Sequence, residues 1–394
     1  MTRSYNLQLS TFKRMRYVEN IILEDAHIEL SEFSEHSREW HAAIHPSGKC
    51  EPLANQITAL RHGLHELLAM LPSTAVAMFA RCHVSDAANQ TQLLRQGLSQ
   101  LLSCPLSVIQ QPPLDGTKAA LWVYLVDNGS ARTLPDGTYA VEHGSYTHLW
   151  RTDIGEDNGD SYMQTRTAME NYARMLEDNG CTLAGNCLRT WLFVRDIDNN
   201  YSGVVRARND VFAQQGLNND THFIASTGID GSSGQHGVLL GMDTYAVRGL
   251  REGQVRHLYA ASHMNRTSDY GVSFERGTAI EYGDRIHALI SGTASIDNRG
   301  QIVHPGDVRR QTERMWENIS TLLDEAGMDM DADIASMDVY LRDMADYATV
   351  RKLFEERFPK HPKNILLAPV CRPGWLIEME CLSVKAHHSD FPAF

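Results

Sequence analysis

An internal repeat constrains the fold of this chain more than any other feature of its sequence. Several residues in the middle of the chain recur, with the same identity, 147 positions later. The matched pairs are Gln164 and Gln311, Glu170 and Glu317, Asn171 and Asn318, Gly180 and Gly327, and Arg195-Asp196 and Arg342-Asp343. After one gap, Tyr201 and Phe212 correspond to Tyr347 and Phe358. Several identities at one offset indicate that the chain contains copies of one structural unit.

Each copy follows the same predicted order of elements: strands, a helix, a strand, a second helix and two further strands. In the N-terminal copy this order rests on pattern, for example on an amphipathic helix predicted over residues 53–71. The sequence therefore predicts an α+β protein of three modules, residues 1–140, 141–250 and 251–394, each a mixed sheet covered by two helices. Because each sheet must bury its free face, we expect a pseudo-threefold, barrel-like assembly, the single-chain version of a trimer, with clefts at its junctions.

Charge and cysteine usage narrow the class of protein. A formal net charge of −13 argues against a nucleic-acid binder with a broad basic surface. The seven cysteines include no CxxC pair, which favours a reduced, cytoplasmic chain over a disulfide framework. The N-terminus has no apolar signal-like stretch, and no run approaches the length of a membrane span. We expect a soluble cytoplasmic monomer, able to associate further, with neither nucleic acid nor membrane as a partner.

Histidines near the N-terminus raise the question of a bound metal. The spacing of His36, His41 and His45 provides at most two ligands on one helix face, and no partner lies at a metal-motif spacing. Solvated helix histidines are the simpler interpretation. We therefore expect no metal, and no motif in the sequence implies a cofactor.

The last predicted strand of the third copy, residues 376–384, carries a carboxylate among apolar residues. Alignment of the copies places Gly241 and Ala120 at the position of Glu378. A carboxylate in an apolar strand costs free energy unless it is partnered or used. One interpretation is an edge-strand residue that faces water. The other is a functional acid kept in one module, which predicts one active cleft per chain.

The third copy resembles the RidA/YjgF family of small trimeric enamine/imine deaminases, also described as endoribonuclease L-PSP-like. The resemblance rests on Leu289-Ile-Ser-Gly-Thr-Ala-Ser-Ile296, His304-Pro-Gly-Asp-Val308, Val339-Tyr-Leu-Arg-Asp343 and Ile377-Glu-Met-Glu380. In that family an arginine in a Pro-Ala-Arg segment holds the substrate carboxylate. The corresponding segment here is Pro362-Lys-Asn364, with asparagine in place of the arginine.

A larger part of the chain, about residues 145–385, resembles the chorismatases, single-chain relatives built on the same fold. The matching features are Gly271-Val-Ser-Phe-Glu-Arg-Gly277, Cys371-Arg-Pro373, Arg189-Thr-Trp191, Arg206-Ala-Arg208 and Ala225-Ser-Thr-Gly-Ile229. The resemblance implies a hydrolase or lyase that cleaves the enolpyruvyl ether of chorismate and releases pyruvate, with Glu378 as the acid. A cysteine at the position of Cys371 resembles the subgroup that forms 3-hydroxybenzoate. The phrase Asp297-Asn-Arg-Gly300 departs from the family pattern, which leaves the substrate open.

Such a reaction needs a carboxylic acid that stays protonated near neutral pH, and burial raises the pKa of a carboxyl in that direction. The two substrate carboxylates require fixed guanidinium groups, for which the candidates are Arg276, Arg372, Arg208 and Arg206. Thr293 and Ser291 are further candidates to bind substrate, and the resemblance adds Gly277 to this set. Alternatively, each arginine is a surface salt-bridge partner and Cys371 a small buried side chain. Two rival functions stay open: a RidA-type imine deaminase, and a non-catalytic small-molecule-binding protein on the same scaffold.

Overall fold

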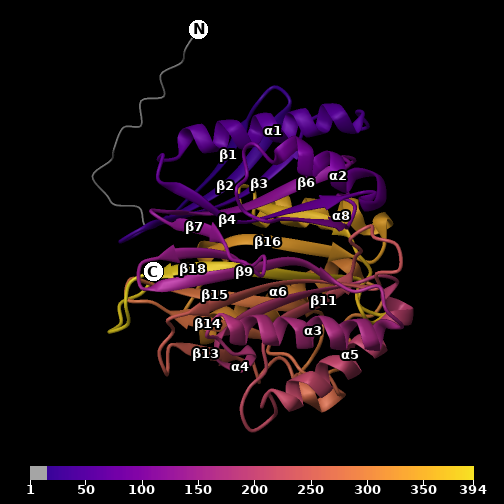
Figure 1. Cartoon of the computed structure of the whole chain (residues 1–394). Helices are drawn as coiled ribbons and strands as arrows, with labels where there is room; N and C mark the ends of the chain where they lie inside the picture. Colours follow the sequence, from indigo (N-terminus) through magenta and orange to yellow (C-terminus); the bar gives the residue numbers. More distant parts are fainter. Residues whose placement is uncertain (1–15) are drawn as a thin grey trace.

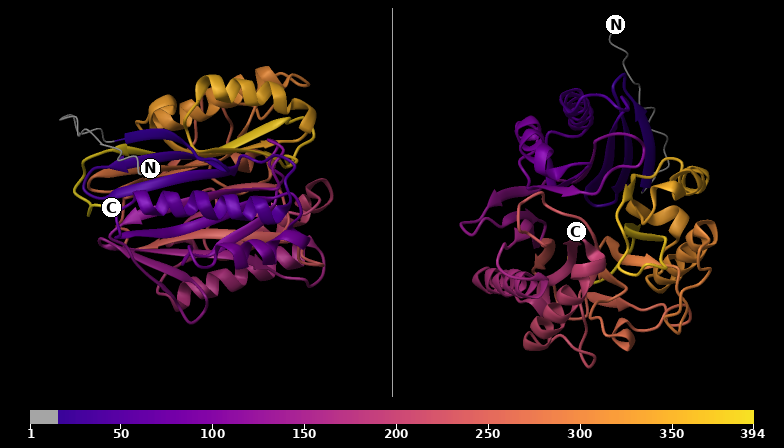
Figure 2. Two further views of the ribbon diagram at one scale, coloured as in Figure 1. Left: turned by 90° about the horizontal axis from the view of Figure 1, so that it is seen from above. Right: turned by 90° about the vertical axis from the view of Figure 1, so that its right-hand side faces the viewer.

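Three six-stranded mixed sheets follow one another along the chain and surround a common axis, with the helices outside (Figures 1 and 2). The computed structural model describes residues 16–394. The sheets divide between Asp127 and Ser130 and between Arg248 and Val255. The predicted α+β class and the three-module architecture are confirmed. Closure into a barrel is not found among the described residues, because neighbouring sheets meet through isolated bridges such as Ile229–Val370 instead of a continuous ladder.

Each sheet has the same topology, with one parallel pair of strands at an edge. In spatial order the first sheet contains β1 (Arg16–Ile22), β2 (Ala26–Ser34), β3 (Arg38–Pro46), β6 (Ala119–Asp127), β4 (Ala75–Val84) and β5 (Leu106–Gln110). The second contains β11 (Ala225–Asp230), β10 (Cys187–Val194), β12 (Leu240–Arg248), β9 (Tyr146–Gly155), β8 (Tyr139–His143) and β7 (Ser130–Thr133). The third contains β13 (Val255–Leu258), β14 (Gly277–Glu281), β15 (Arg285–Ala294), β18 (Ile377–Ala386), β16 (Ile334–Leu341) and β17 (Lys363–Leu367).

Two long helices cover each sheet. They are α1 (Leu53–Met70) and α2 (Ala87–Leu98), α3 (Ser161–Asp178) and α5 (Ile197–Gln214), and α6 (Val308–Glu325) and α8 (Tyr347–Arg357). Short helical turns connect them to the strands: α4 (Leu183–Asn186), α7 (Met330–Asp333), η1 (Thr267–Tyr270) and η2 (Met344–Asp346). None of the helices in residues 16–394 combines the length and apolar character that crossing a membrane requires.

The residues that begin and end the helices α3 and α6 recur in the two modules. Asp160 accepts a hydrogen bond from the backbone N–H of Met163 at 3.0 Å, and Asp307 accepts one from that of Arg310 at 3.1 Å. Each carboxylate thus satisfies a helical N–H that would otherwise lack a partner. After the two helices, Gly180 and Gly327 adopt φ values of +71° and +73°, which other residues rarely adopt.

A glutamine in the first helix of each module fixes the start of the closing strand. The side-chain oxygen of Gln311 accepts from the N–H of Leu376 at 2.9 Å, and that of Gln164 accepts from the N–H of Leu239 at 2.8 Å. In the first module Gln56 accepts from the N–H of Lys118 at 2.7 Å. The same bond in three modules sets one common register. Ala120, Gly241 and Glu378 each lie two residues after the bonded N–H, so their predicted equivalence is confirmed.

Two of the N-terminal histidines lie in an unexpected setting. The prediction that His41 and His45 are solvated helix residues is wrong, because β3 runs through both and buries them. The residues around them read as a strand, with Trp40, Ala42 and Ile44 alternating on the apolar face. Among the described residues, no group of three or more histidine, cysteine or acidic side chains could hold a metal ion.

Candidate active site

Glu378 lies in the interior of the third sheet. It is the second residue of β18, a central strand, where Ala294 of β15 and Tyr340 of β16 flank it. Its side chain is 4% exposed and its strand neighbours Ile377 and Met379 are fully buried. The interpretation of Glu378 as an edge residue that faces water is therefore wrong.

Burial, together with the nearby carboxylate of Glu380, raises the pKa of Glu378 to about 8, against the opposing charges of Arg189 and Arg276. In an apolar setting the charged form loses its hydration, so the neutral form is favoured. The carboxyl therefore still carries its proton at neutral pH. It can act as a general acid there, as an ordinary glutamate could not.

Glycine is required directly beside this acid. A Cβ added at Gly292 would overlap Oε1 of Glu378. The backbone N–H of Gly292 donates to Oγ1 of Thr227 at 2.8 Å, which holds β15 of the third module against β11 of the second. The segment Ser291-Gly292 thus brings the backbone close enough for Glu378 to lie between the two modules.

A cavity opens at Glu378 along the junction of the second and third modules. Its lining comes from α5 and β11 on one side, and from the segments around β14, β15 and β18 on the other. The lining residues are Tyr201, Arg208, Ser226, Gly228, Tyr270, Val272, Phe274, Arg276, Gly292, Ala294, Ile296, Cys371, Arg372, Trp375 and Glu378. The structure thus brings together Glu378, Cys371, Arg208, Arg276 and Arg372, five of the residues predicted from the sequence.

Two buried arginines in this lining are incompletely satisfied. Arg208 and Arg276 are only 1% and 3% exposed. Within residues 16–394, Nε and Nη2 of Arg208 and Nε of Arg276 are buried without a hydrogen-bond partner. Buried N–H groups without acceptors cost free energy, and those of a cation cost more. An anionic ligand in the cavity would supply the missing acceptors.

Aromatic rings surround the guanidinium groups. Arg276 lies over the rings of Tyr270 and Phe274 at 5.6 and 5.7 Å, and Arg372 lies over those of Tyr270 and Trp375 at 4.6 and 4.9 Å. Such contacts stabilise the cations and fix their planes. The cations of Arg276 and Arg372 therefore lie between flat apolar walls.

Cys371 contributes a neutral thiol to the cavity. Burial raises the pKa of the Cys371 thiol to about 12, and the carboxyl of Glu378 adds to the shift. Since the thiolate is the nucleophilic form, this cysteine is not poised for covalent attack at neutral pH. It can still exclude water or donate a weak hydrogen bond to a bound molecule.

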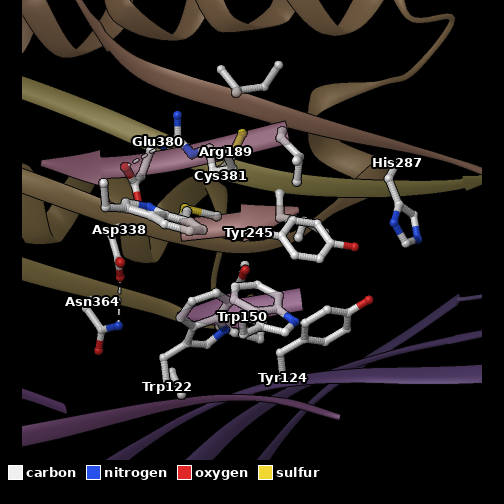
Figure 3. Close-up of a pocket in the computed structure, with 18 residues that line it drawn as sticks. Trp122, Tyr124, Trp150, Arg189, Tyr245, His287, Asp338, Asn364, Glu380 and Cys381 are labelled. Carbon is white, nitrogen blue, oxygen red and sulfur yellow. Dashed lines mark hydrogen bonds and ion pairs between the residues drawn. The ribbon is translucent and has the colours of Figure 1, made fainter. Parts of the chain in front are cut away.

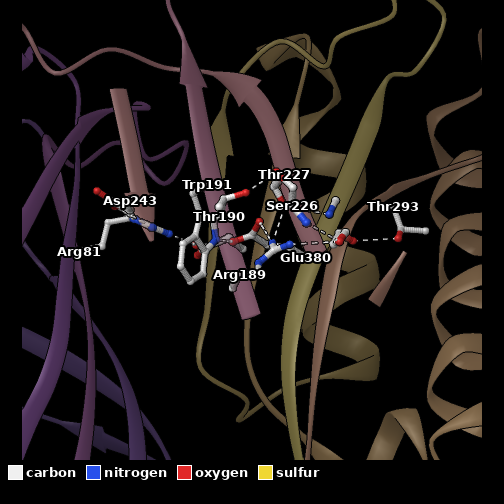
Figure 4. A network of polar contacts seen from close by, with 12 residues as sticks. Arg81, Arg189, Thr190, Trp191, Ser226, Thr227, Asp243, Thr293 and Glu380 are labelled. Atoms are coloured by element: carbon white, nitrogen blue, oxygen red, sulfur yellow. Dashed lines mark hydrogen bonds and ion pairs between the residues drawn. The ribbon is translucent and has the colours of Figure 1, made fainter. Parts of the chain in front are cut away.

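Glu380, the next residue on the same side of β18, is held in a buried ion pair (Figure 4). Nη2 of Arg189 donates to Oε2 of Glu380 at 2.8 Å, and Nε1 of Trp191 donates to Oε1 at 2.7 Å. Arg189 also donates to Thr227 at 2.5 Å, which in turn holds Gly292. The pair therefore joins the two modules close to the candidate acid. It also places the negative charge of Glu380 near the neutral carboxyl of Glu378.

Four predicted residues lie outside the cavity. Arg206 is exposed on α5, over the ring of Tyr162 at 5.4 Å. Oγ of Ser291 donates to the carbonyl of Glu275 at 2.6 Å, and Oγ1 of Thr293 donates to the carbonyl of Ser291 at 2.9 Å. Gly277 lies in β14, where an added Cβ would meet Ile290 and Leu258. The contacts of Ser291, Thr293 and Gly277 hold strands together, and none of the four side chains lines the cavity at Glu378.

The sequence did not point to several residues of the lining. Tyr270 and Trp375 lie in none of the matched motifs, and Phe274 lies in the Gly271–Gly277 match without a predicted role. Only the folded chain brings these three rings to the arginines. Tyr201 had one signal, its repeat at Tyr347. The ion pair of Glu380 was visible only as an unexplained second carboxylate in the closing strand.

A second, central cavity lies where all three sheets meet (Figure 3). Its walls include Trp122 of β6, Trp150 of β9 and Tyr245 of β12, and the last two rings stack at 4.2 Å. Arg189 and Glu380 lie at its border, so the same ion pair separates the central cavity from the one at Glu378. This aromatic packing forms the apolar centre around which the modules are assembled.

Comparisons with known proteins agree with this architecture. The sequence model of the family Endoribonuclease L-PSP matches residues 277–385, from β14 to β18. A RutC family protein of Pyrococcus abyssi is 36% identical over 110 residues, which are 27% of this chain and 84% of that protein. A crystal structure of a chorismatase shares the fold over 78% of this chain and 93% of its own, with a TM-score of 0.61 and 20% identity.

Fold and site together define a single-chain protein of three modules with one acid-bearing cavity between the second and the third. The chain belongs to the RidA/YjgF superfamily.

Proposed function

We propose that this protein cleaves the enolpyruvyl ether of chorismate, or of a closely related enol-ether acid, by general-acid catalysis in the cavity at Glu378. One observation carries the proposal. A buried carboxyl with a pKa of about 8 lies in the same cavity as two buried arginines, each of which has at least one N–H group without an acceptor among the described residues. The fold shared with a chorismatase supports it.

The acid would act first. Glu378 gives its proton to the terminal methylene carbon of the enol ether, which leaves a cation at the carbon that bears the ether oxygen. Water adds to that carbon and returns a proton to the Glu378 carboxylate. The hemiketal then collapses to pyruvate and a ring alcohol, so one water is consumed and the acid is restored. General-acid catalysis of this kind contributes roughly 10²–10⁴-fold to a rate.

The arginines would bind the two carboxylates of the substrate. Arg208 comes from the second module, and Arg276 and Arg372 come from the third, so substrate would bridge the junction. Because the chain carries a formal net charge of −13, a dianion is attracted only where such local cations outweigh the overall field. The aromatic walls of Tyr270, Phe274 and Trp375 suit a flat six-membered ring.

Cys371 would influence the fate of the ring. As a neutral thiol at the cavity wall, it fills space beside Glu378 that a water molecule could otherwise occupy. Less water at that point favours attack of the ring hydroxyl on the cationic carbon, which forms a cyclic ketal. Cleavage of one ring C–O bond and loss of a ring proton would then release pyruvate and a hydroxybenzoate without consuming water, instead of a dihydroxy-cyclohexadiene acid. Replacement of Cys371 by alanine tests this through the ratio of the two products, measured by liquid chromatography.

Pyruvate release from chorismate is the direct test. Purified protein is incubated with chorismate, and pyruvate is followed by its reduction with lactate dehydrogenase and NADH. The expected result is release by the wild type and a loss of about 10²–10⁴-fold in Glu378→Gln. A wild type that releases no pyruvate above the uncatalysed rate would refute the proposal.

Membership of the RidA/YjgF superfamily supports a second candidate, an imine deaminase. In the register of the parallel strands, Thr227 of β11 takes the place that Asn364 has in β17. The strand that completes the cavity at Glu378 therefore provides a threonine where the deaminases have arginine, and carboxylate binding would depend on Arg208 and Arg276. Faster ammonia release from an imine generated by an amino-acid oxidase would favour this function over ether cleavage.

A further inference from the structure

The junction of the third module with the first contains another cavity. Its volume is about 330 Å³, against about 40 Å³ for the cavity at Glu378. β2 and β3 form one wall, and α8 and β17 form the other. Cavities of roughly 300–1,000 Å³ hold small-molecule ligands, so this space is large enough for one.

This junction is built like the one at Glu378 but carries different chemistry. Tyr347 on α8 lies where Tyr201 lies on α5. In the strand register, Glu29 lies opposite Ala43 at the position where Arg276 meets Ser291 in the third module. A carboxylate thus replaces the arginine that would bind an anion, and the acid of the closing strand is absent because Ala120 stands there.

A buried imidazole faces the inner end of this cavity. His45 is 7% exposed, and its ring stacks on that of His27 with centroids 4.7 Å apart. Its Nε2 lies 3.9 Å from Oε2 of Glu29, and its Nδ1 lies 3.8 Å from Oδ2 of Asp115. Both distances exceed a hydrogen bond, and Nε2 is buried without a partner among residues 16–394. Burial lowers the pKa of His45 to about 4, so the ring is neutral and can accept a hydrogen bond.

The charges around the cavity are partly committed to one another. Glu29 is bound by the backbone N–H of Lys363 at 3.0 Å and by its ammonium group. Arg351 donates to Glu355 at 2.6 Å. Asp115 uses Oδ1 for the N–H and the hydroxyl of Thr117, which leaves Oδ2 toward His45. With the two ion pairs neutralised, Asp115 contributes a negative charge at the inner end, and the exposed Lys49 contributes a positive charge in the lining.

We propose that this cavity is a second ligand site, which binds a small zwitterion of the α-amino acid class. The ammonium group donates to Nε2 of His45 and to Oδ2 of Asp115, and the carboxylate lies toward Lys49. The ligand of this site carries no net charge, whereas the substrate proposed for the Glu378 cavity carries two negative charges. The proposal does not depend on the function proposed for that cavity.

The test uses L-norvaline with two matched controls that each lack one charged group, pentanoate and butylamine. Binding to the full-length wild type is measured by isothermal titration calorimetry up to about 10 mM, which covers millimolar affinity. One norvaline is expected to bind per chain, at least about tenfold more tightly than either control, since each lost charged hydrogen bond costs about 1.5–3 kcal/mol. No binding of norvaline, or equal binding of pentanoate or butylamine, would overturn the proposal.

Three variants locate the bound molecule. Asp115→Asn and Lys49→Ala should each weaken norvaline binding about tenfold or more, whereas Glu378→Gln should leave it unchanged. Lys49 is exposed, so its variant should fold normally, and unfolding temperatures of all three check this. Binding that falls in Glu378→Gln and persists in Lys49→Ala would place norvaline in the other cavity and refute this one.

Discussion

The closing strands of the second and third modules, β12 and β18, have the same register in their sheets but differ in whether they carry an unpaired acid. A glutamine fixes the start of each, and a carboxylate follows four residues later, Asp243 in β12 and Glu380 in β18. Each of these pairs with an arginine of the preceding module: Asp243 with Arg81 at 2.9 Å and Glu380 with Arg189 at 2.8 Å. The strands differ at the position that lies midway between the glutamine-bonded N–H and the paired acid, where β12 has Gly241 and β18 has Glu378.

This difference separates a structural acid from a chemical one. The acids that recur in both strands are bonded to a cation and hold modules together. Glu378 has no acidic counterpart at this position in the other modules and, within residues 16–394, no arginine bonded to it, and burial keeps it neutral. An uncompensated buried carboxyl reduces stability at the pH where it would ionise, so its presence in one strand only supports the catalytic role that we propose for it.

The largest expected effect comes from Glu378→Gln, which leaves β18, like β12, without an acid at this position. Pyruvate release should fall by about 10²–10⁴-fold, because the proton donor is lost while the shape is kept. Since the pKa of Glu378 is raised from its ordinary value to about 8, its stabilising contribution is full at acid pH and is lost as pH rises through 8. The variant should therefore unfold at a higher temperature than the wild type at pH 9 and show less difference at pH 5. A drop in activity together with lower stability at pH 9 would contradict this account.

The two structural acids should affect stability about equally. Asp243→Asn removes the nearer of the two carboxylates beside the buried Arg81, and Glu380→Gln removes the carboxylate that pairs with the buried Arg189. Breaking such a pair costs up to about 3–5 kcal/mol in the free energy of unfolding, measured by urea denaturation. Only the second should also change catalysis. Glu380 raises the pKa of Glu378, so its removal should move the alkaline fall of kcat, expected near pH 8 in the wild type, to lower pH. An identical pH profile in both variants would show that Glu380 is structural only.

Arg208→Met should separate binding from folding. Loss of a charged hydrogen bond to substrate, about 1.5–3 kcal/mol, should lower kcat/KM by about 10–100-fold. The buried guanidinium has N–H groups without acceptors, so replacing it with an apolar side chain should leave the unfolding temperature unchanged or raise it. Arg206→Met, on the exposed side of the same helix, is the matched control and should change neither quantity.

The smallest effect is expected at Gly241. An added Cβ there would meet only Phe193, at 3.9 Å, so Gly241→Ala should fold and gain about 0.5–1 kcal/mol of stability in its strand. Pyruvate release should stay within about twofold of the wild type. A marked loss of activity would mean that the second module's closing strand takes part in the reaction.

The repeat made much of the fold predictable from the sequence. The capping aspartates, the glycines after the helices and the glutamines of the first helices are local features that recur at a fixed spacing. The equivalence of Glu378, Gly241 and Ala120 follows instead from an alignment of the closing strands themselves, because Gly241 and Glu378 lie 137 positions apart and not 147.

The rest of the site depends on how modules meet, which periodicity does not report. Arg206 and Arg208 are two residues apart on α5, and such residues face different sides of a helix, so only Arg208 reaches the cavity. The sequence comparison places the family arginine at the position of Asn364 in the third module. In the structure, β11 of the second module completes the Glu378 cavity, and the equivalent position there is Thr227. The richness of this segment in histidine and charge favours a loop and a short helix, although the alternation of Trp40, Ala42 and Ile44 is a local signal for the strand that is found.

Carrying the three modules on one chain changes what a point mutation can do. In an assembly of identical subunits, every substitution appears at all three junctions at once, so a change that benefits one site must be tolerated by the other two. Here each junction is encoded separately. An acid can be kept at one boundary and lost at the other two, one of which carries buried imidazoles at other positions, so each interface can specialise independently.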